Sequence, residues 1–549
     1  MSKYVLTILD TTGIQSYIFN SNRLRENIGA SYLVEWSTKD LVEDKLAELG
    51  IPKDRQYEPI ESSGLIAELI YAAGGNATIL FKSMNDAKKF TKKLSRQILV
   101  EAPGLNIVAA HTEFDWEENS LYEKVKYLQE EELEKQKRAR IPSVPLLGLG
   151  VTAFCKSTQL PAVNTSRGYL NADESDIYLI SRETEGKLKV TSPQYKQPAN
   201  QVLRKKFADV LQGYEFPYRM DHVGGSKGES SYYAVVHADG NSMGNRFKEY
   251  GKNSQDNRDY IKRIQELSKS VSQAGEAAVK KVIQVLINSI ENGEVMGKFF
   301  IKNNFLPFRP LVYGGDDITF VCDGRLGLEL AAIFLEEFQK QEVKDGKPLT
   351  ACAGVCIVKS HYPFARAYKL SEALCNSAKK FVREQKKEDR EFSAIDWHIA
   401  STGLLGSIGE IRQREYQVQE GDLTMRPLFI EGENSRYMSR NKWCNWSNFT
   451  KVIQTFNNDE IWKGRRNKII ALREKLREGK KATREFRKAY NIDNLPHIEG
   501  GARKALQEEG WTGKRCGYFD AIEAMEFYFP LNKVGEKNDS LQAENEITQ

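Results

Sequence analysis

The sequence predicts an α+β fold built from two ferredoxin-like βαββαβ units, a linker module and a C-terminal helical domain. Two observations predict the units. Apolar strands and helical stretches follow one another in the same order in residues 1–116 and 230–403, and each set contains a hairpin with a Gly-Gly turn. The linker module then covers residues 117–229 and the helical domain residues 404–532. Residues 533–549 are polar, and we expect them to be disordered.

The elements of the second unit begin with a strand over Tyr232–Asp239, which ends in the glycine-rich turn Gly240–Gly244. A long helical stretch covers Asn257–Glu291, and a hairpin follows at Tyr313–Phe320. A helix, a strand and a second helix complete the unit at Leu326–Glu342, Thr350–Val358 and Phe364–Glu384. This order places the end of the first strand beside the hairpin of its neighbour.

The first unit repeats this order. Its first strand ends at Asp10, and its hairpin lies at Leu69–Phe81. A helix over Asp86–Leu99 and a strand over Leu105–Thr112 complete it, so the chain is an internal duplication of one topology. The turn of the first hairpin reads Gly-Gly-Asn-Ala at Gly74–Ala77, where the second reads Gly-Gly-Asp-Asp. An amide and a methyl group cannot replace two anionic ligands, so the first unit should hold a substrate without ligating a catalytic metal.

The chemistry of the second unit is concentrated in its hairpin, Y-G-G-D-D-I-T-F. Gly314 and Gly315 can adopt positive φ and let a ligand approach the backbone closely. Asp316 and Asp317 at the tip repel each other unless a cation neutralises them. Hard oxygen ligands near nucleotide phosphates suit Mg²⁺ or Mn²⁺. A solvated turn is the alternative, because Gly and Asp are common turn residues.

A third carboxylate supports the metal interpretation. Asp239 ends the first strand of the unit and can reach Asp316 and Asp317. The amides of Gly240–Gly244 are suited to cradle a phosphate at the entrance of the following helix. Two-metal nucleotidyl transfer needs such a cluster, with one ion activating a hydroxyl and the other holding the leaving phosphate. The sequence therefore predicts a nucleotide-processing site.

Segments of the second unit also carry a family resemblance. They are H-A-D-G-N-S-M-G at 237–244, V-Y-G-G-D-D at 312–317, A-C-A-G-V-C-I-V-K-S-H-Y-P-F at 351–364 and A-Y-K-L-S-E-A-L-C-N-S-A-K-K at 367–380. The unit resembles the second palm of the large subunit of type III CRISPR effectors, which makes cyclic oligoadenylate from ATP. It is also similar to GGDEF domains and class III nucleotide cyclases. The segment S-A-I-D-W-H-I-A-S-T-G around Asp396 and His398 is closer to the CRISPR branch.

Val5–Leu33, with its G-I-Q turn and L-R-x-x-x-G-A-S helix, resembles the first palm of that subunit, so we call the units the first and second palm. Large members of the family often begin with an HD nuclease domain. Here palm sequence starts at Lys3 and no His-Asp dipeptide occurs, so DNA cleavage by that route is not expected. The linker contains one cysteine, Cys155, which excludes a four-thiolate zinc site there. We expect a compact relative or a stand-alone signalling enzyme.

The resemblance implies roles for residues of the second palm. Asp239 and Asp316 would be metal ligands, with Asp317 third and polarising the attacking 3′-hydroxyl. Lys379 lies where the family has a triphosphate-binding lysine; an ordinary surface lysine is the alternative, and Lys380 beside it leaves the register open. The nucleotide-binding set on this palm is completed by Gly240, Ser242, Gly314 and Gly315. The Ser242 hydroxyl would donate to phosphate or cap the helix.

On the first palm, Gln15, Arg25 and Ser31 would hold the acceptor nucleotide, and a helix-surface ion pair is an equal alternative for Arg25. Asp10 is either a leftover ligand position or a turn-former, and we favour the turn-former. The ring of His237 points to the same strand face as Asp239, and we expect it to serve in packing. We expect His398 to be structural.

Composition agrees with a cytosolic enzyme of several domains. No apolar run approaches the length of a membrane span, and the N-terminus M-S-K-Y-V-L-T-I-L-D lacks the apolar region of a secretory signal. The seven cysteines are scattered, and Cys352 and Cys356 suit buried core thiols better than disulfides. The net charge of +5 does not by itself argue for nucleic-acid binding.

Local charge is more informative. Leu121–Arg140 should form a solvated connecting helix. From Met425 onward, Trp443, Trp446 and Trp462 lie near the basic runs K-G-R-R-N-K at 463–468 and R-E-K-L-R-E-G-K-K-A-T-R-E-F-R-K at 473–488. This mixture can bind an RNA backbone. We favour a helical bundle with a solvated basic face. The resemblance implies that this domain contacts neighbouring subunits.

The expected function is conversion of ATP to cyclic oligoadenylate with pyrophosphate release, assisted by Mg²⁺ or Mn²⁺. Each palm binds one triphosphate, and phosphoryl transfer then needs mainly positioning and charge neutralisation. The expected partners are ATP, CRISPR effector subunits and guide or target RNA, with no membrane, and homo-oligomerisation is left open. The alternatives are another cyclic nucleotide product, a non-catalytic subunit of an RNA-guided complex, and a templated polymerase.

Overall fold

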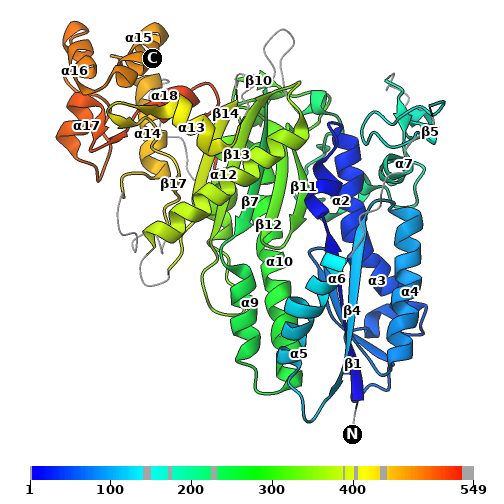
Figure 1. The fold of residues 1–549 in the computed structure, drawn as a ribbon. Helices are drawn as coiled ribbons and strands as arrows, with labels where there is room; N and C mark the ends of the chain where they lie inside the picture. The colour runs from blue at the N-terminus through cyan, green and yellow to red at the C-terminus, as the bar shows by residue number, and fades with distance from the viewer. Residues whose placement is uncertain are drawn as a thin grey trace, which may run out of the picture.

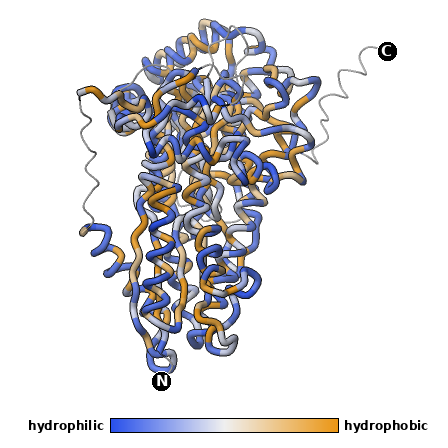
Figure 2. The backbone as a smooth tube through the Cα atoms, turned by 90° about the vertical axis from the view of Figure 1, so that its right-hand side faces the viewer, coloured by the Kyte–Doolittle hydropathy of each residue, from blue (hydrophilic) through white to orange (hydrophobic). Residues whose placement is uncertain are grey.

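The computed structural model describes residues 3–139, 150–170, 176–223, 232–386, 390–400, 406–432 and 442–533. The expected disordered tail therefore lies outside the described residues from residue 534 onward. Figure 1 shows two mixed layers of sheet and helix side by side, with the C-terminal domain against the second of them. Along the tube of Figure 2, hydrophobic and hydrophilic positions alternate within the elements, as expected of helices and strands with one buried face.

The first palm has the predicted βαββαβ topology, with strand order β2-β3-β1-β4. Its strands are β1 (Lys3–Thr12), β2 (Ala67–Ala73), β3 (Asn76–Phe81) and β4 (Asn106–Asp115). Its helices are α1 (Ile14–Phe19), α2 (Leu24–Thr38), α3 (Asp40–Ala47), η1 (Lys53–Arg55) and α4 (Met84–Glu101). The central strand β1 pairs antiparallel with β3 and β4. The expected elements are confirmed, with shifts of a few residues at their ends.

The second palm has strand order β11-β12-β7-β13-β14-β17. Its strands are β7 (Tyr232–Gly240), β11 (Phe308–Gly314), β12 (Asp317–Asp323), β13 (Ala351–Lys359), β14 (Ala394–Ala400) and β17 (Leu428–Phe429). Its helices are α9 (Met243–Lys252), α10 (Asn257–Asn288), α11 (Gly327–Phe338) and α12 (Phe364–Gln385). After α10 the short strands β8 (Ile290–Glu291), β9 (Glu294–Val295) and β10 (Phe299–Phe300) form a small sheet. The α+β fold class and the second βαββαβ unit are thus confirmed.

The two palms share one apolar core. Leu9 and Ile28 of the first palm belong to the same buried cluster as Val235 and Val321 of the second. In Figure 1, α2 lies beside β11, the edge strand of the second palm. The two palms also meet where the ring of Phe19 on α1 stacks on Tyr368 of α12, with centroids 3.9 Å apart. Shared burial of this kind holds the palms in a fixed relation to each other.

The first part of the linker module packs on the first palm, whereas Leu203, Phe207 and Phe216 near its end belong to the buried cluster of the second palm. Its elements are α5 (Leu121–Tyr127), η2 (Leu128–Glu132), α6 (Leu133–Ala139), β5 (Asn164–Thr165), η3 (Ser166–Tyr169), β6 (Leu179–Ile180), α7 (Arg182–Lys189), α8 (Ala199–Lys206) and η4 (Met220–His222). The predicted solvated helix at 121–140 is helical over its described residues, 121–139, but one side is buried against the palm sheet through Leu121, Leu128 and Leu133. The segment is not fully solvated because its leucines recur at helical spacing and form an apolar face among the many charged residues.

The C-terminal domain is less purely helical than expected. Its helices are α13 (Ile408–Tyr416), α14 (Trp446–Asn458), α15 (Arg466–Glu478), α16 (Lys480–Ala489), α17 (Arg503–Glu509) and α18 (Phe519–Ala524). Short strands β15 (Gln417–Val418), β16 (Gly421–Asp422), β18 (Trp511–Thr512) and β19 (Arg515–Cys516) form a sheet of order β15-β16-β19-β18. In addition, β17 joins the second palm by pairing with β14, so the predicted boundary at residue 404 does not separate the two sheets.

Other expectations about the core can be judged directly. Trp443, Trp446 and Trp462 are all buried, so these rings stabilise the C-terminal domain and do not face a ligand. Cys352 and Cys356 are buried and unpaired, as predicted. The Cys155 thiol is also buried and lies 3.3 Å from the Thr184 hydroxyl. Within the described residues, no helix has the length and apolar character needed to span a membrane.

Candidate active site

The strand register brings the ends of β7 and β12 together. Thr319 pairs with His237 and Ile318 with Ala238, so Asp317 and Asp239 continue the two strands at the same edge. Asp316 forms part of the two-residue turn between β11 and β12. The backbone N–H of Gly240 donates to the Asp316 carbonyl at 3.1 Å and joins the hairpin to the end of β7. The predicted meeting of strand end and hairpin is therefore present.

Glycine is required where these backbones approach. A Cβ at Gly240 would lie 2.7 Å from the Asp316 Cβ, which is closer than unbonded carbons can be. At the hairpin, Gly315 has φ +71° and its carbonyl oxygen would lie 2.0 Å from a Cβ at Gly275 of α10. Gly314 does not adopt positive φ, which corrects the expectation for that residue, but a Cβ there would meet open space. The hairpin tip thus rests directly on α10.

Lys379 faces the carboxylates. Its Nζ lies 2.5 Å from Asp239 Oδ2 and donates to the Gly240 carbonyl at 3.1 Å. The Lys379 side chain is 18% exposed, whereas that of Lys380 is 75% exposed and lies near Glu384. The open question of register is therefore resolved in favour of Lys379. Helix α12 can approach the sheet this closely because residue 354 of β13 is a glycine. A Cβ at Gly354 would lie only 2.0 Å from the Ser371 carbonyl oxygen.

Burial and repulsion between carboxylates disfavour the charged forms of the two hairpin aspartates. Desolvation, followed by repulsion from Asp239, raises the pKa of Asp316 and of Asp317 to about 7 in each case. Lys379 opposes both shifts. The Oδ1 atom of Asp317 is buried without a hydrogen-bond partner, and His237 Nδ1 lies 3.5 Å away. A site of this kind favours the approach of a cation.

The residue types fit a divalent cation, but the three carboxylates are not gathered as expected. No group of three or more His, Cys, Asp or Glu side chains in the described part of the chain is placed to hold a metal ion. Asp239 is instead paired with Lys379. The orphaned oxygen of Asp317 and the raised pKa values of both hairpin aspartates fit a cation that binds together with a nucleotide. Metal ligation by Asp239, Asp316 and Asp317 stays a prediction.

The remaining predicted residues of the second palm have protein partners. Ser242 has φ +52° at the N-cap of α9 but makes no side-chain cap, which corrects the capping alternative. Its hydroxyl donates to Glu391 Oε1 at 2.8 Å. The His237 ring lies 3.1 Å from the Thr319 hydroxyl and packs edge-on against Tyr368, as expected of a packing role. Burial lowers the pKa of His237.

The predicted residues of the first palm do not converge on the hairpin aspartates. Gln15 is exposed on α1. Arg25 is buried, donates to the Tyr169 carbonyl at 3.2 Å and lies over the Tyr218 ring, so its side chain does not lie on the helix surface. The Ser31 hydroxyl donates to the Leu311 carbonyl of β11. Asp10 lies within β1 and pairs with Lys137 at 2.8 Å, which corrects the turn-former interpretation.

Two residues near the site escaped prediction. Tyr71 on β2 of the first palm lies near Asp316. Burial and the charge of Asp316 raise the pKa of Tyr71 to about 12, and a hydrogen bond with Ser268 of α10 acts in the opposite direction. Glu372 on α12 contributes to the raised pKa of Asp317. Tyr71 has no local sequence signal, because only the packing of α10 between the hairpins brings it there. Glu372 could have been predicted, because it lies two helical turns before Lys379 and therefore on the same face of α12.

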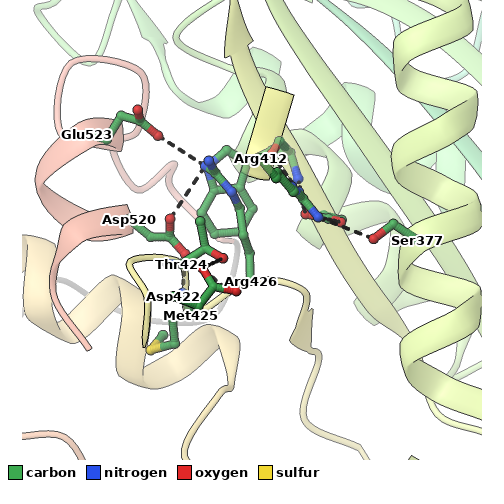
Figure 3. A network of polar contacts seen from close by, with 10 residues as sticks. Ser377, Arg412, Asp422, Thr424, Met425, Arg426, Asp520 and Glu523 are labelled. Carbon is green, nitrogen blue, oxygen red and sulfur yellow. Dashed lines mark hydrogen bonds and ion pairs between the residues drawn. The ribbon is translucent and has the colours of Figure 1, made fainter. Parts of the chain in front are cut away.

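A buried charge network lies behind α12 (Figure 3). Arg412 of α13 makes two short contacts with Asp396 of β14, at 2.6 and 2.9 Å, and lies 3.3 Å from the Ser377 hydroxyl. Arg426 is fully buried and contacts Asp520 and Glu523 of α18 at 3.5 and 3.2 Å. The network ties the helix that carries Lys379 to the C-terminal domain. His398 lies nearby, and burial lowers its pKa to about 3, as expected of a structural histidine.

A family model matches the part of the chain that carries this site. Residues 232–389 match the family model described as Cas10/Cmr2, second palm domain. These residues are therefore similar to a Cas10/Cmr2 second palm. This match spans β7 through α12, so Asp239, Asp316, Asp317 and Lys379 all lie inside it. No curated protein matches the chain.

Solved structures with the same fold support the architecture of the whole chain. A Csm1-Csm4 cassette in complex with cA4 is 13% identical, with a TM-score of 0.50. Csm1-Csm4 cassettes in complex with AMPPNP and with pppApApA are each 14% identical, with TM-scores of 0.50. In all three comparisons 96% of this chain and 69% of the other chain are covered. At this identity the likeness shows the fold, which therefore extends beyond the second palm.

Proposed function

We propose that this chain is a nucleotidyltransferase that joins ATP into cyclic oligoadenylate and releases pyrophosphate, as the large subunit of a type III CRISPR effector or a related antiviral system. One observation carries the proposal. Asp239 pairs with Lys379 where β7 ends beside the β11–β12 hairpin that carries Asp316 and Asp317, within the segment that matches the Cas10/Cmr2 second palm. The ligands of the similar cassettes, cA4, AMPPNP and pppApApA, support the choice of adenine nucleotides.

The second palm would bind the donor triphosphate. Lys379 is held at the site by Asp239 and would exchange this partner for phosphate oxygens, which carry more negative charge. Asp239, Asp316 and Asp317 would hold Mg²⁺ or Mn²⁺, which supplies neutralisation of phosphate charge and activation of the 3′-hydroxyl when bound. Asp317 would accept a hydrogen bond from that hydroxyl. The open space beside Gly314 would let a phosphate approach the hairpin backbone.

The first palm would position the acceptor nucleotide. Its hairpin has no carboxylate in the Gly-Gly-Asn-Ala turn, so it would bind without ligating metal. Gln15 is exposed, whereas Ser31 and Arg25 already donate to protein carbonyls. Of the predicted first-palm set, Gln15 would therefore contact the nucleotide most directly. Positioning of this kind provides a large part of the rate of phosphoryl transfer.

The test is incubation of the purified chain with ATP or GTP and Mg²⁺ or Mn²⁺, with products resolved by mass spectrometry. We expect cyclic oligoadenylate from ATP, and a loss of at least about 100-fold in the double variant Asp316→Ala/Asp317→Ala. A matched control is Glu478→Ala, which removes an exposed carboxylate paired with Lys475 on α15 of the C-terminal domain. Product formation by the double variant would show that the carboxylates are not catalytic.

The other candidates are separated by the same assay and by a primer-extension assay. A cyclic dinucleotide or mononucleotide would appear as a different mass, and extension of an annealed primer would reveal a templated polymerase. If the lone chain makes no product, the assay is repeated with co-purified effector subunits and target RNA. Inactivity of that complex would indicate a non-catalytic subunit and end the proposal.

A further inference from the structure

The C-terminal domain contains a basic surface that the proposed reaction does not use. Residues 463–490 contain twelve Lys or Arg and three Asp or Glu, a net charge of +9, against +5 for the whole chain. The remainder of the chain is therefore net acidic, and positive charge is concentrated on α15, α16 and the turn before them. Lysine is depleted at protein–protein interfaces, whereas clustered Lys and Arg are the electrostatic footprint of a polyanion site.

A cavity opens on this surface where α15 begins. Its volume is about 480 Å³, and it is lined by Gly464, Arg465, Arg466, Asn467, Lys468 and Tyr490. Helix α15 is long enough for its backbone dipole to favour an anion at this end, and its N-cap residue, Arg465, makes no side-chain cap. The cavity therefore combines cationic side chains with the positive end of a helix.

Two of the three cations that line the cavity, Arg465 and Lys468, lack carboxylate partners in the described part of the chain. Lys468 is only 9% exposed, donates to the Ile461 carbonyl at 3.2 Å and lies 4.9 Å from the centre of the Trp462 ring. Burial and the charge of Arg465 lower the pKa of Lys468. Neither residue has an ion pair with a described carboxylate, whereas Arg466 pairs with Glu526. A buried ammonium without a counter-ion is unfavourable, and an incoming anion would relieve this cost.

An aromatic ring completes the cavity. Tyr490 lines it, and the residue is 51% exposed, unlike the three buried tryptophans of the domain. Proteins that bind single-stranded nucleic acid combine a basic groove with exposed rings on which bases stack. We propose that this cavity binds a phosphate of single-stranded nucleic acid, with an adjacent base stacked on Tyr490.

The test measures fluorescence anisotropy of a labelled single-stranded RNA, and separately of the DNA of the same sequence, with the full chain at several salt concentrations. The cavity variant is Arg465→Glu/Arg466→Glu, at two residues that line the cavity. The control variant Arg473→Glu/Lys481→Glu makes the same change in net charge on α15 and α16, at residues that lie beside Glu474 and Glu485. Comparison of RNA with DNA identifies which nucleic acid is preferred.

We expect the cavity variant to weaken binding by about tenfold or more and to reduce the slope of log affinity against log salt by about 2. Tyr490→Ala should weaken binding about fivefold without changing that slope, because it removes stacking. The control should bind nearly as wild type. Circular dichroism verifies that each variant is folded.

Equal losses in the cavity and control variants would overturn the proposal, because the effect would then be non-specific charge. It would also fail if the wild type bound neither RNA nor DNA, for example because an acidic protein occupies the surface. This outcome is independent of nucleotidyl transfer, since none of these residues lies near Asp316.

Discussion

Substitution of Gly275 tests how the hairpin is positioned. Gly275 lies within α10, and a Cβ there would be 2.0 Å from the Gly315 carbonyl oxygen and 3.1 Å from its carbonyl carbon. Unbonded carbon and oxygen atoms approach to about 3.3 Å at closest. In Gly275→Ala, the hairpin turn that carries Asp316 must therefore move by about 1.3 Å relative to α10.

A displacement of this size affects catalysis more than stability. Misplacement of reacting groups by about 1 Å can cost about 100-fold in rate. Overpacking costs about 1–3 kcal/mol, and replacing a helical glycine by alanine returns about 1 kcal/mol, so the free energy of unfolding should fall by about 0–2 kcal/mol. We expect Gly275→Ala to lower pyrophosphate release from ATP about 100-fold while remaining folded.

The assay compares initial rates of pyrophosphate release with urea unfolding followed by circular dichroism. Gly409→Ala is the matched control, because Gly409 is an exposed helical glycine whose added Cβ would meet its nearest neighbour at 3.9 Å. The control should keep full activity and unfold at the same or slightly higher urea concentration. Full activity in Gly275→Ala would refute the reasoning that contact with α10 positions the hairpin.

Three further predictions concern Lys379, Arg426 and Glu329. Lys379→Ala should lower activity about 100-fold, whereas Lys380→Ala should leave it unchanged; equal rates for the two would disprove the assigned register. Arg426→Met should cost about 3–5 kcal/mol in urea unfolding, because Asp520 is left buried without its cation, and adding Asp520→Asn should recover part of the loss. Burial raises the pKa of Glu329 to about 7, so its contribution to stability is full below about pH 4.5 and is lost as pH rises to 7. Glu329→Gln should flatten stability over that range, and an unchanged pH profile would contradict the assignment.

The sequence by itself determined the elements and the place of the chemistry. An apolar run that ends in Asp239 and a glycine turn specifies a strand end, and two apolar runs around Gly-Gly-Asp-Asp specify a hairpin. The repetition of this order predicted both sheets. Each of these inferences depends on neighbours along the chain, where period and turn chemistry apply directly.

Only the tertiary structure decided what surrounds those residues. Tyr71 lies near Asp316 because α10 packs between two hairpins more than 200 residues apart in the sequence. The pairing of Lys379 with Asp239, in place of a preformed carboxylate cluster, depends on how closely α12 approaches the sheet at Gly354. The packing of the C-terminal helices likewise decides that Trp443, Trp446 and Trp462 are buried and that Tyr490 is exposed. Burial and long-range contacts are set by how whole elements pack, and a local pattern does not contain that information.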